Sequence, residues 1–356
     1  MNTVFAERRF FRAEEKTVGE RIARSIVLAA HPDGPVKESD LRFGTLFVRE
    51  PGENEMLLET QYLSLEPYMR ARMDAVKSYT AHLEIGDVMI GQSVARVIVS
   101  CHPQFQVGDI VLAWTGWRTL FLSNGENVRK LDPDVVPPTS WLGILGFAGF
   151  AAYVGLRELA PPAPGETVVV AAASGGVGSL VGQLARKAGA RAVGIAGGSE
   201  KCSYIKEAFG FDEAVDHRAP DLDKRLATAC PNGVDVYFEN VGGDVFTAVW
   251  PLLNQNARIP ICGLVGQFGT SPPPGPDRLP GAMRQILSKN LTIRGLLTTN
   301  YPQLRGDFEK EIIDGLRYGT IRQREDITDG FGETVRAFMR MLDGRSFGKS
   351  VVRVAT

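Results

Sequence analysis

Cysteine is scarce in this sequence, and its spacing argues against several kinds of protein. The chain of 356 residues has 4 cysteines, at positions 101, 202, 230 and 262, and no two of them form a C-x-x-C pair. A dense disulfide framework is excluded, a four-cysteine zinc lobe is not expected, and the scattered thiols favour the reducing cytoplasm. The 4 histidines are scattered as well. We therefore expect no metal site, because catalytic zinc needs three protein ligands.

A strong net charge and a long apolar run are also missing. The formal net charge is -1, so no basic field exists to attract nucleic acid or an anionic membrane surface. No stretch is long and apolar enough to span a bilayer, and the N-terminus lacks the apolar core of a signal peptide. We expect no nucleic-acid partner and no membrane partner. The length exceeds what one hydrophobic core usually serves, so two domains are expected.

Two hydrophobic patterns divide the chain. Over residues 24–131, short apolar or alternating runs between glycines and prolines predict closely spaced strands in a small barrel or sandwich. Over residues 165–297, apolar strands alternate with helical stretches, which predicts a parallel, doubly wound sheet. A helix is expected over 334–342, and the last strand, 350–354, is expected to return to the first domain. The predicted fold class is α/β, with a β-rich domain and a Rossmann domain.

The predicted domain boundaries follow from these patterns. Residues 1–22 form an N-terminal extension, 23–140 together with 317–356 form the β-rich domain, and 141–316 form the Rossmann domain.

A glycine-rich turn stands between a predicted buried strand, 167–173, and a predicted helix, 179–188. It contains Ser174, Gly175, Gly176, Val177 and Gly178. Glycines let the backbone approach a ligand closely, and a helix N-terminus offers N–H groups and a partial positive charge to a pyrophosphate. The usual fingerprint has a glycine where this chain has Ala173. Since strand, turn and helix occur together, we predict a dinucleotide site rather than an ordinary turn.

The end of the next strand favours NADP over NAD. An NAD enzyme usually places an acidic residue there to hold the ribose 2′-hydroxyl, whereas this chain has Gly197, Ser199 and the cation Lys201. A carboxylate would repel a 2′-phosphate, and a lysine can bind one. The alternative is that Lys201 is an ordinary solvated helix residue.

Several widely separated motifs resemble one family. They include the segments 62–70 (YLSLEPYMR), 171–178 (AAASGGVG), 197–201 (GGSEK), 238–243 (FENVGG), 261–263 (ICG) and 347–349 (FGK). The chain resembles the zinc-independent medium-chain dehydrogenase/reductases, in particular the group of leukotriene/prostaglandin reductases, curcumin reductases and plant double-bond reductases. The resemblance implies a GroES-like β-rich catalytic domain, a Rossmann domain that binds NADP(H), and a homodimer.

The resemblance also implies roles for individual residues. The glycine turn would hold the pyrophosphate, and Lys201 the 2′-phosphate. Other predicted cofactor contacts are Asn240, Cys262, Phe268, Leu296, Leu297, Thr298 and Ser346, together with His217 where relatives carry a tyrosine. The alternative for His217 is a surface histidine of a loop.

The chemistry expected from the resemblance is reduction of the C=C bond of an α,β-unsaturated aldehyde or ketone. Hydride adds to the β-carbon, and hydrogen bonds stabilise the charge that collects on the carbonyl oxygen. The family places a tyrosine where this chain has Phe268, which has no proton to donate. Tyr68 and Tyr79 are therefore the predicted catalytic residues. The alternatives are a wall residue for Tyr68 and simple surface exposure for Tyr79.

Phe268 keeps two other functions open. One is reduction of a carbonyl or a quinone on the same scaffold. The other is a non-redox protein that binds NADPH.

Overall fold

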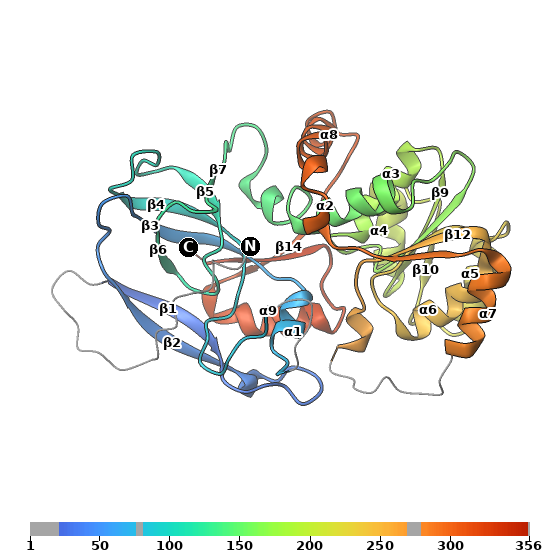
Figure 1. Cartoon of the computed structure of the whole chain (residues 1–356), viewed down its shortest axis with the longest axis horizontal. Coiled ribbons are helices and arrows are strands. Elements are labelled where there is room, and N and C mark those ends of the chain that lie inside the picture. Colours follow the sequence, from blue (N-terminus) through green and yellow to red (C-terminus); the bar gives the residue numbers. More distant parts are fainter. Residues whose placement is uncertain (1–20, 76–80, 269–278, 355–356) are drawn as a thin grey trace.

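The structure, a computed structural model, describes residues 21–75, 81–268 and 279–354. It has two units side by side, with β-rich sheets in one and a helix-covered sheet in the other (Figure 1). This confirms the predicted α/β class with a β-rich unit and a Rossmann sheet. Most of the predicted N-terminal extension lies outside the described residues, and its last two residues, Arg21 and Ile22, already belong to the first strand.

The Rossmann unit is built on six parallel strands. Their order across the sheet is β10 (Glu213–Asp216), β9 (Arg191–Ala196), β8 (Thr167–Ala171), β11 (Val234–Phe238), β12 (Leu253–Ile261) and β13 (Thr292–Gly295). The order reverses between β8 and β11, as in dinucleotide-binding sheets, where ligands bind at the reversal point. All five residues of β8 are buried, because helices cover both faces of such a sheet.

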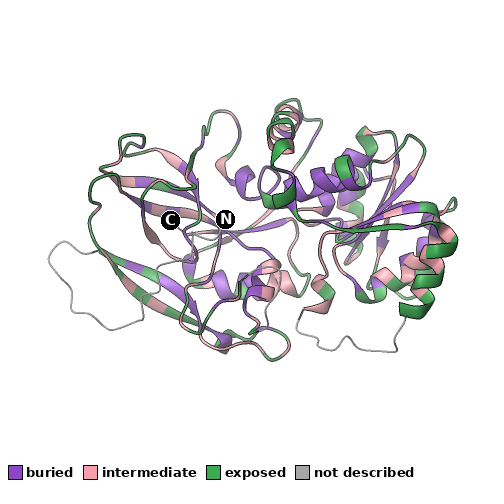
Figure 2. Ribbon diagram, in the orientation of Figure 1, coloured by how far each residue is buried: buried purple, intermediate pink, exposed green. Residues whose placement is uncertain are grey.

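Helices follow most of these strands. They are α3 (Gly178–Lys187), α4 (Ser199–Phe209), α5 (Leu222–Ala229), α6 (Gly243–Val249) and α7 (Leu279–Lys289), with α2 (Phe147–Val154) before the sheet and α8 (Arg305–Arg317) after it. Gly182 lets α3 pack closely against Phe211, because a Cβ at position 182 would lie 1.9 Å from the Phe211 ring. Figure 2 shows the strands mostly buried, whereas α7 has no buried residue.

The β-rich unit contains a seven-stranded sheet. Its order is β14 (Glu325–Asp329), β15 (Lys349–Arg353), β3 (Met56–Ser64), β4 (Ser93–Ser100), β5 (Ile110–Ala113) and β7 (Arg129–Lys130), with β6 (Leu120–Ser123) also paired to β3. β15 is antiparallel to β3, with Val352 opposite Leu63. The expectation that the last strand returns to the first unit is therefore confirmed, although the strand begins one residue earlier.

The remaining elements close this unit. β1 (Arg21–Leu28) and β2 (Leu41–Val48) form a two-stranded antiparallel ribbon. α1 (Tyr68–Arg72) follows β3, and α9 (Thr334–Leu342) has the predicted bounds. In the core, the rings of Trp117 and Phe338 pack edge to face at 5.2 Å.

An ion cluster joins the two units at one side. Glu309 of α8 accepts hydrogen bonds from Arg129 of β7 at 2.7 Å and from Arg305 at 2.7 Å. Burial opposes ionisation of this carboxyl group, but the two arginines outweigh it and lower the pKa of Glu309. The units are therefore joined by charge as well as by the chain.

Candidate functional site

The glycine turn joins β8 to α3 in a conformation that only small residues allow. A Cβ on Gly178 would lie 2.4 Å from the carbonyl oxygen of Ala172, a distance that real contacts do not show. A Cβ on Gly175 would lie 3.3 Å from the same oxygen. The helix begins after Val177, whose side chain makes no capping hydrogen bond. The N–H of Ser179 donates within the turn, to the carbonyl oxygen of Gly175 at 3.1 Å. The backbone just before it is built of glycine at a helix N-terminus, where phosphate groups commonly bind.

The ends of β9 and β10 gather positive charge beside Gly197. A Cβ on Gly197 would lie 2.9 Å from Nε of Arg218 and 2.9 Å from Nε2 of His217. Asp216 braces the turn, since its Oδ1 accepts hydrogen bonds from the N–H of Gly198 at 2.8 Å and of Arg218 at 2.9 Å. Burial disfavours the Asp216 carboxylate, but these two N–H groups, together with the charges of His217 and Arg218, outweigh it and lower the pKa of Asp216. The acid is thus engaged by the backbone.

Lys201 lies at this end of the site and is buried, with 9% of its surface exposed. Its Nζ donates to the carbonyl oxygens of Gly344 at 2.9 Å and Ser346 at 2.5 Å. The alternative of a solvated helix lysine is therefore wrong. Burial, and then the neighbouring Arg218, lower the pKa of Lys201. The structure brings Lys201 and Ser346 together, although 145 residues separate them in the chain.

Arg218 is a residue that the sequence reasoning missed. Its Nη2 donates to the carbonyl oxygen of Gly344 at 3.2 Å, so it shares an acceptor with Lys201. Its neighbour His217 is exposed as a residue, but its imidazole is partly covered by the surrounding protein. This partial burial, and then the charge of Arg218, lower the pKa of His217. A signal was available, because Arg218 directly follows His217, which was itself a predicted cofactor contact.

The predicted nicotinamide contacts lie at the carboxyl ends of neighbouring strands. Asn240, after β11, donates its Nδ2 hydrogen to the carbonyl oxygen of Ala171 at 2.9 Å. The N–H of Leu296, after β13, donates to the carbonyl oxygen of Ile261 at 2.9 Å. Cys262 directly follows Ile261 in the chain, and Leu297 and Thr298 directly follow Leu296. One edge of the sheet therefore carries the glycine turn, Asn240, Cys262 and the 296–298 segment.

A buried carboxylate organises this edge. Glu239 is fully buried and accepts hydrogen bonds from the N–H groups of Val241 at 2.5 Å and Gly242 at 2.8 Å, and from the hydroxyl of Tyr237 at 2.8 Å. Burial raises the pKa of Glu239. Burial and then Glu239 raise the pKa of Cys262 to about 12. The Cys262 thiol is therefore neutral at physiological pH.

Of the two predicted catalytic tyrosines, only Tyr68 lies among the described residues. Tyr68 is the first residue of α1, half-buried, and its ring packs on Phe147 with centroids 5.8 Å apart. Tyr79 lies outside the described residues. Phe268 is half-buried and follows a short 3-10 turn, Val265–Gln267. The catalytic and cofactor roles of these side chains remain predictions.

Known protein families and relatives match this chain along nearly its whole length. Residues 24–131 match the family described as N-terminal domain of oxidoreductase, and residues 176–314 match the one described as zinc-binding dehydrogenase. The chain is 46% identical over 334 residues to an NADPH-dependent curcumin reductase of Escherichia coli (strain K12), covering 93% of this chain and 97% of that one. It belongs to the zinc-independent medium-chain dehydrogenase/reductases.

Two further relatives widen the range of activities within this family. Prostaglandin reductase 1 of Rattus norvegicus is 37% identical and covers 93% of this chain and 99% of its own. A 2-alkenal reductase (NADP(+)-dependent) of Nicotiana tabacum is 35% identical and covers 93% and 97%. The solved structure of CurA in complex with NADPH from Vibrio vulnificus superposes with a TM-score of 0.90 at 44% identity, covering 94% of this chain and 99% of that chain.

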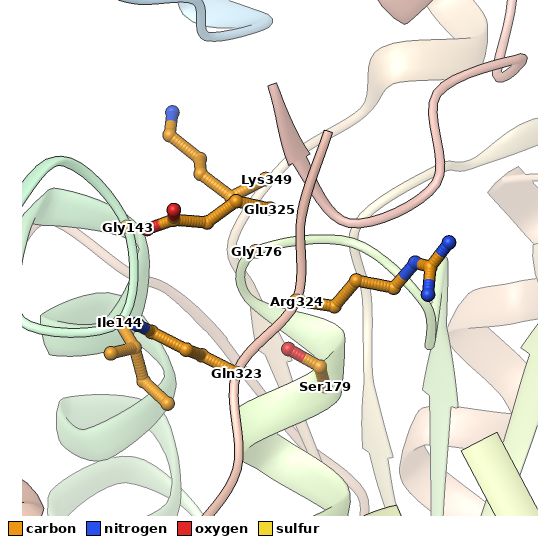
Figure 3. A pocket seen from close by; sticks show the side chains of 8 residues that line it. All are labelled: Gly143, Ile144, Gly176, Ser179, Gln323, Arg324, Glu325 and Lys349. Atoms are coloured by element: carbon orange, nitrogen blue, oxygen red, sulfur yellow. The ribbon is translucent and has the colours of Figure 1, made fainter. Parts of the chain in front are cut away.

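A second set of residues near the glycine turn, centred on Arg324, was not predicted from the sequence. Arg324 packs on the rings of Phe347, with its Cζ 3.8 Å from the centroid, and Tyr204, at 4.7 Å. A small pocket beside it is lined by Gly176 of the glycine turn, Ser179 of α3 and the segment 323–325 from the other unit (Figure 3). No cluster of three potential metal ligands occurs among residues 21–75, 81–268 and 279–354. Within the same ranges, no helix has the length and apolar character to cross a membrane.

Proposed function

We propose that this chain is an NADPH-dependent reductase of the C=C bond of α,β-unsaturated aldehydes or ketones. The observation that carries the proposal is the glycine turn, where a Cβ at Gly178 would fall 2.4 Å from a backbone oxygen, next to the cations around Gly197. The names of the relatives, curcumin reductase, 2-alkenal reductase and prostaglandin reductase, describe the same kind of reaction. The substrate is accordingly a small molecule with a conjugated carbonyl group.

The residues present fit NADPH. Gly175, Gly176, Val177 and Gly178 would hold the pyrophosphate through the backbone. Side chains near Gly197 would hold the 2′-phosphate, namely Ser199, Lys201, His217 and Arg218. Asn240, Cys262, Phe268, Leu296, Leu297 and Thr298 would line the nicotinamide side, whereas Ser346, in contact with Lys201, would lie at the 2′-phosphate end. When bound, the cofactor supplies a hydride to the β-carbon of the substrate.

The substrate side has an aromatic wall of Tyr68 and Phe147. In our proposal the Tyr68 hydroxyl donates a hydrogen bond to the carbonyl oxygen of the substrate, where negative charge develops. Tyr79 is the second candidate for proton donation.

Phe268 is the observation that favours a second candidate. Without a hydroxyl at this position, the site offers less stabilisation to an enolate oxygen. Reduction of a quinone or carbonyl group, or NADPH binding without reduction, is therefore the alternative.

The test is a substrate panel with product analysis. Purified protein is mixed with NADPH and with enals, enones and quinones, and the loss of NADPH absorbance is followed. The proposal expects turnover of the enones with a saturated ketone as product, and NADH serves as the control cofactor. An allylic alcohol as product would support carbonyl reduction. Tight NADPH binding with no turnover of any compound would support the non-redox alternative.

We also propose a homodimer formed at the free edge of the Rossmann sheet. All four residues of the edge strand β13 are exposed, and on the adjacent helix α7 the exposed apolar side chains are Leu279, Met283 and Leu287. An exposed strand edge flanked by apolar side chains can pair with its own copy across a twofold axis. Light scattering should give the mass of two chains, and Met283→Glu together with Leu287→Glu should reduce it to one. The matched control is Val107→Glu, at a site with 66% exposure on the other unit.

The domain boundaries and the compartment belong to the proposal as well. Limited proteolysis should cut near the predicted boundary at residue 317, where the chain is exposed, and not near residue 140, where it is buried. The four cysteines are free, which supports a cytoplasmic location, and cell fractionation would test it.

A further inference from the structure

Lys349, the first residue of β15, forms a buried ion pair with Glu66. Its Nζ lies 3.0 Å from Oε1 of Glu66 and donates to the carbonyl oxygen of Leu65 at 2.8 Å. The two side chains are only 7% and 9% exposed. Neither residue of this pair is among those assigned above to the cofactor or the substrate.

The pair lies where the two units meet. A Cβ on Gly143 would lie 3.1 Å from Cγ of Lys349, and a Cβ on Gly176 would lie 3.4 Å from its Cδ. The aliphatic part of Lys349 therefore runs between these two glycines, and Gly176 belongs to the turn that would hold the pyrophosphate. Figure 3 shows Lys349 and Glu325 on one side of the pocket and Arg324 extending away on the other.

The other end of the pair reaches the segment that carries Tyr68. Glu66 is two residues before Tyr68, and its carbonyl oxygen accepts the N–H of Met69 at 3.1 Å, which forms the first turn of α1. The N–H of Leu65 donates to the carbonyl oxygen of Ser350 at 3.2 Å. Lys349 thus contacts the glycine turn through its aliphatic chain and, through its ammonium group, the residues Leu65 and Glu66 just before α1.

Stability alone does not account for such a pair. Removing two charges from water costs about as much as their attraction returns, and apolar side chains of similar volume often stabilise a protein equally well. Here a further carboxyl group is involved, because Glu325 of β14 is in register with Lys349. Burial lowers the pKa of Lys349 and raises that of Glu325, and the Glu66 carboxylate opposes the change at Lys349.

We propose that the Glu66–Lys349 ion pair is a positioning pair, which fixes Tyr68 relative to the glycine turn. The inference rests on the proposed function, because it requires a substrate at Tyr68 and NADPH at Gly176. Hydride transfer depends steeply on the distance and angle between the reacting groups. A charged contact with three defined hydrogen-bonding atoms restricts that geometry more than an apolar contact of the same size would.

The experiment separates the effect of the Lys349 charge from the effect of its aliphatic chain. Lys349→Met keeps the aliphatic contact with Gly143 and Gly176 but removes the charge. We expect kcat for an enone to fall roughly tenfold or more, with the NADPH dissociation constant, measured by cofactor fluorescence, unchanged. The double variant Glu66→Leu with Lys349→Met removes the remaining buried charge of the pair, and we expect it to recover thermal stability without recovering kcat. The matched control is Lys187→Met, which removes an exposed ion pair with Glu311.

A second background tests whether the pair acts through Tyr68. In Tyr68→Ala protein the Lys349→Met change should no longer lower kcat, because the positioned ring is absent. Wild-type turnover in Lys349→Met, or recovery of both stability and kcat in the double variant, would overturn the positioning role. If the wild-type protein binds NADPH but reduces no member of the panel, the proposed function fails first and the positioning role fails with it.

Discussion

The two units of this reductase contribute to the site in different ways. The Rossmann unit shapes its half with backbone, since the glycine turn leaves no room for a side chain at position 178. The β-rich unit contributes side chains, such as Tyr68 on α1 and Lys349 on β15. A half built from backbone is visible in the sequence as glycines at fixed spacing, whereas a half built from side chains depends on contacts between distant segments.

The strongest test of this difference between the two units is a substitution at Gly178, in the half of the site that is built from backbone. Gly178→Ala adds one methyl group against the carbonyl oxygen of Ala172, and such overpacking costs about 1–3 kcal/mol. We expect NADPH affinity, measured by calorimetry, to fall by up to roughly a hundredfold. The control Gly306→Ala adds the same group where no atom lies within 4 Å. Equal behaviour of the two variants would show that the backbone cradle does not set affinity.

Side chains at the other end of the cofactor site should read the 2′-phosphate. Lys201→Met removes a charged hydrogen bond, which contributes about 1.5–3 kcal/mol, and should weaken NADPH but not NADH. Arg218→Ala should do the same to a smaller extent, because Arg218 is exposed. Lys206→Met, on the same helix and paired with Glu213 at the surface, is the control. Equal loss for both cofactors would remove Lys201 from the phosphate site.

On the substrate side, a single hydroxyl group can be restored. Phe268→Tyr should raise kcat/KM for enones by about tenfold, part of what one oxyanion donor contributes. The NADPH dissociation constant should stay the same, because the ring is retained. No gain in rate would mean that another group already stabilises the carbonyl oxygen, and the alternative of carbonyl or quinone reduction would then lose its main support.

The smallest expected effect is at the ion cluster between the units. The folded protein lowers the pKa of Glu309, so this carboxylate stabilises the fold above its unfolded pKa, and the contribution is lost as pH falls through the folded value. Glu309→Gln should therefore reduce the free energy of unfolding at neutral pH by about 1 kcal/mol, a modest value for a partly solvated pair. The difference from wild type should vanish in acid. Urea unfolding at both pH values measures it, and a difference independent of pH would contradict the assignment.

Local patterns predicted much of the fold. The strand predicted over 167–173 begins at Thr167, and the helix over 334–342 has the predicted bounds, because continuous apolar runs and amphipathic spacing are local properties. The helix α8 was not predicted. Its buried residues are only Phe308, Ile312 and Gly315, a weak pattern, and it is held in part by the ion cluster with Arg129.

The site was predictable to the extent that it is local. The glycine turn and its helix could be identified from the sequence. The contact of Lys201 with Ser346 spans 145 residues, and that of Lys349 with Glu66 spans 283, so no sequence spacing reveals them. Arg218 was adjacent to a predicted contact and could have been included.

The place of β15 inside its sheet, between β14 and β3, sets the order in which a growing chain can complete its parts. Every strand of the Rossmann sheet has been synthesised once residue 295 is added, whereas the sheet that begins the chain waits for its last segment. Domains generally fold as they emerge during synthesis. The unit encoded first is therefore finished last, and a nascent chain released before residue 349 would contain a complete parallel sheet beside an open one.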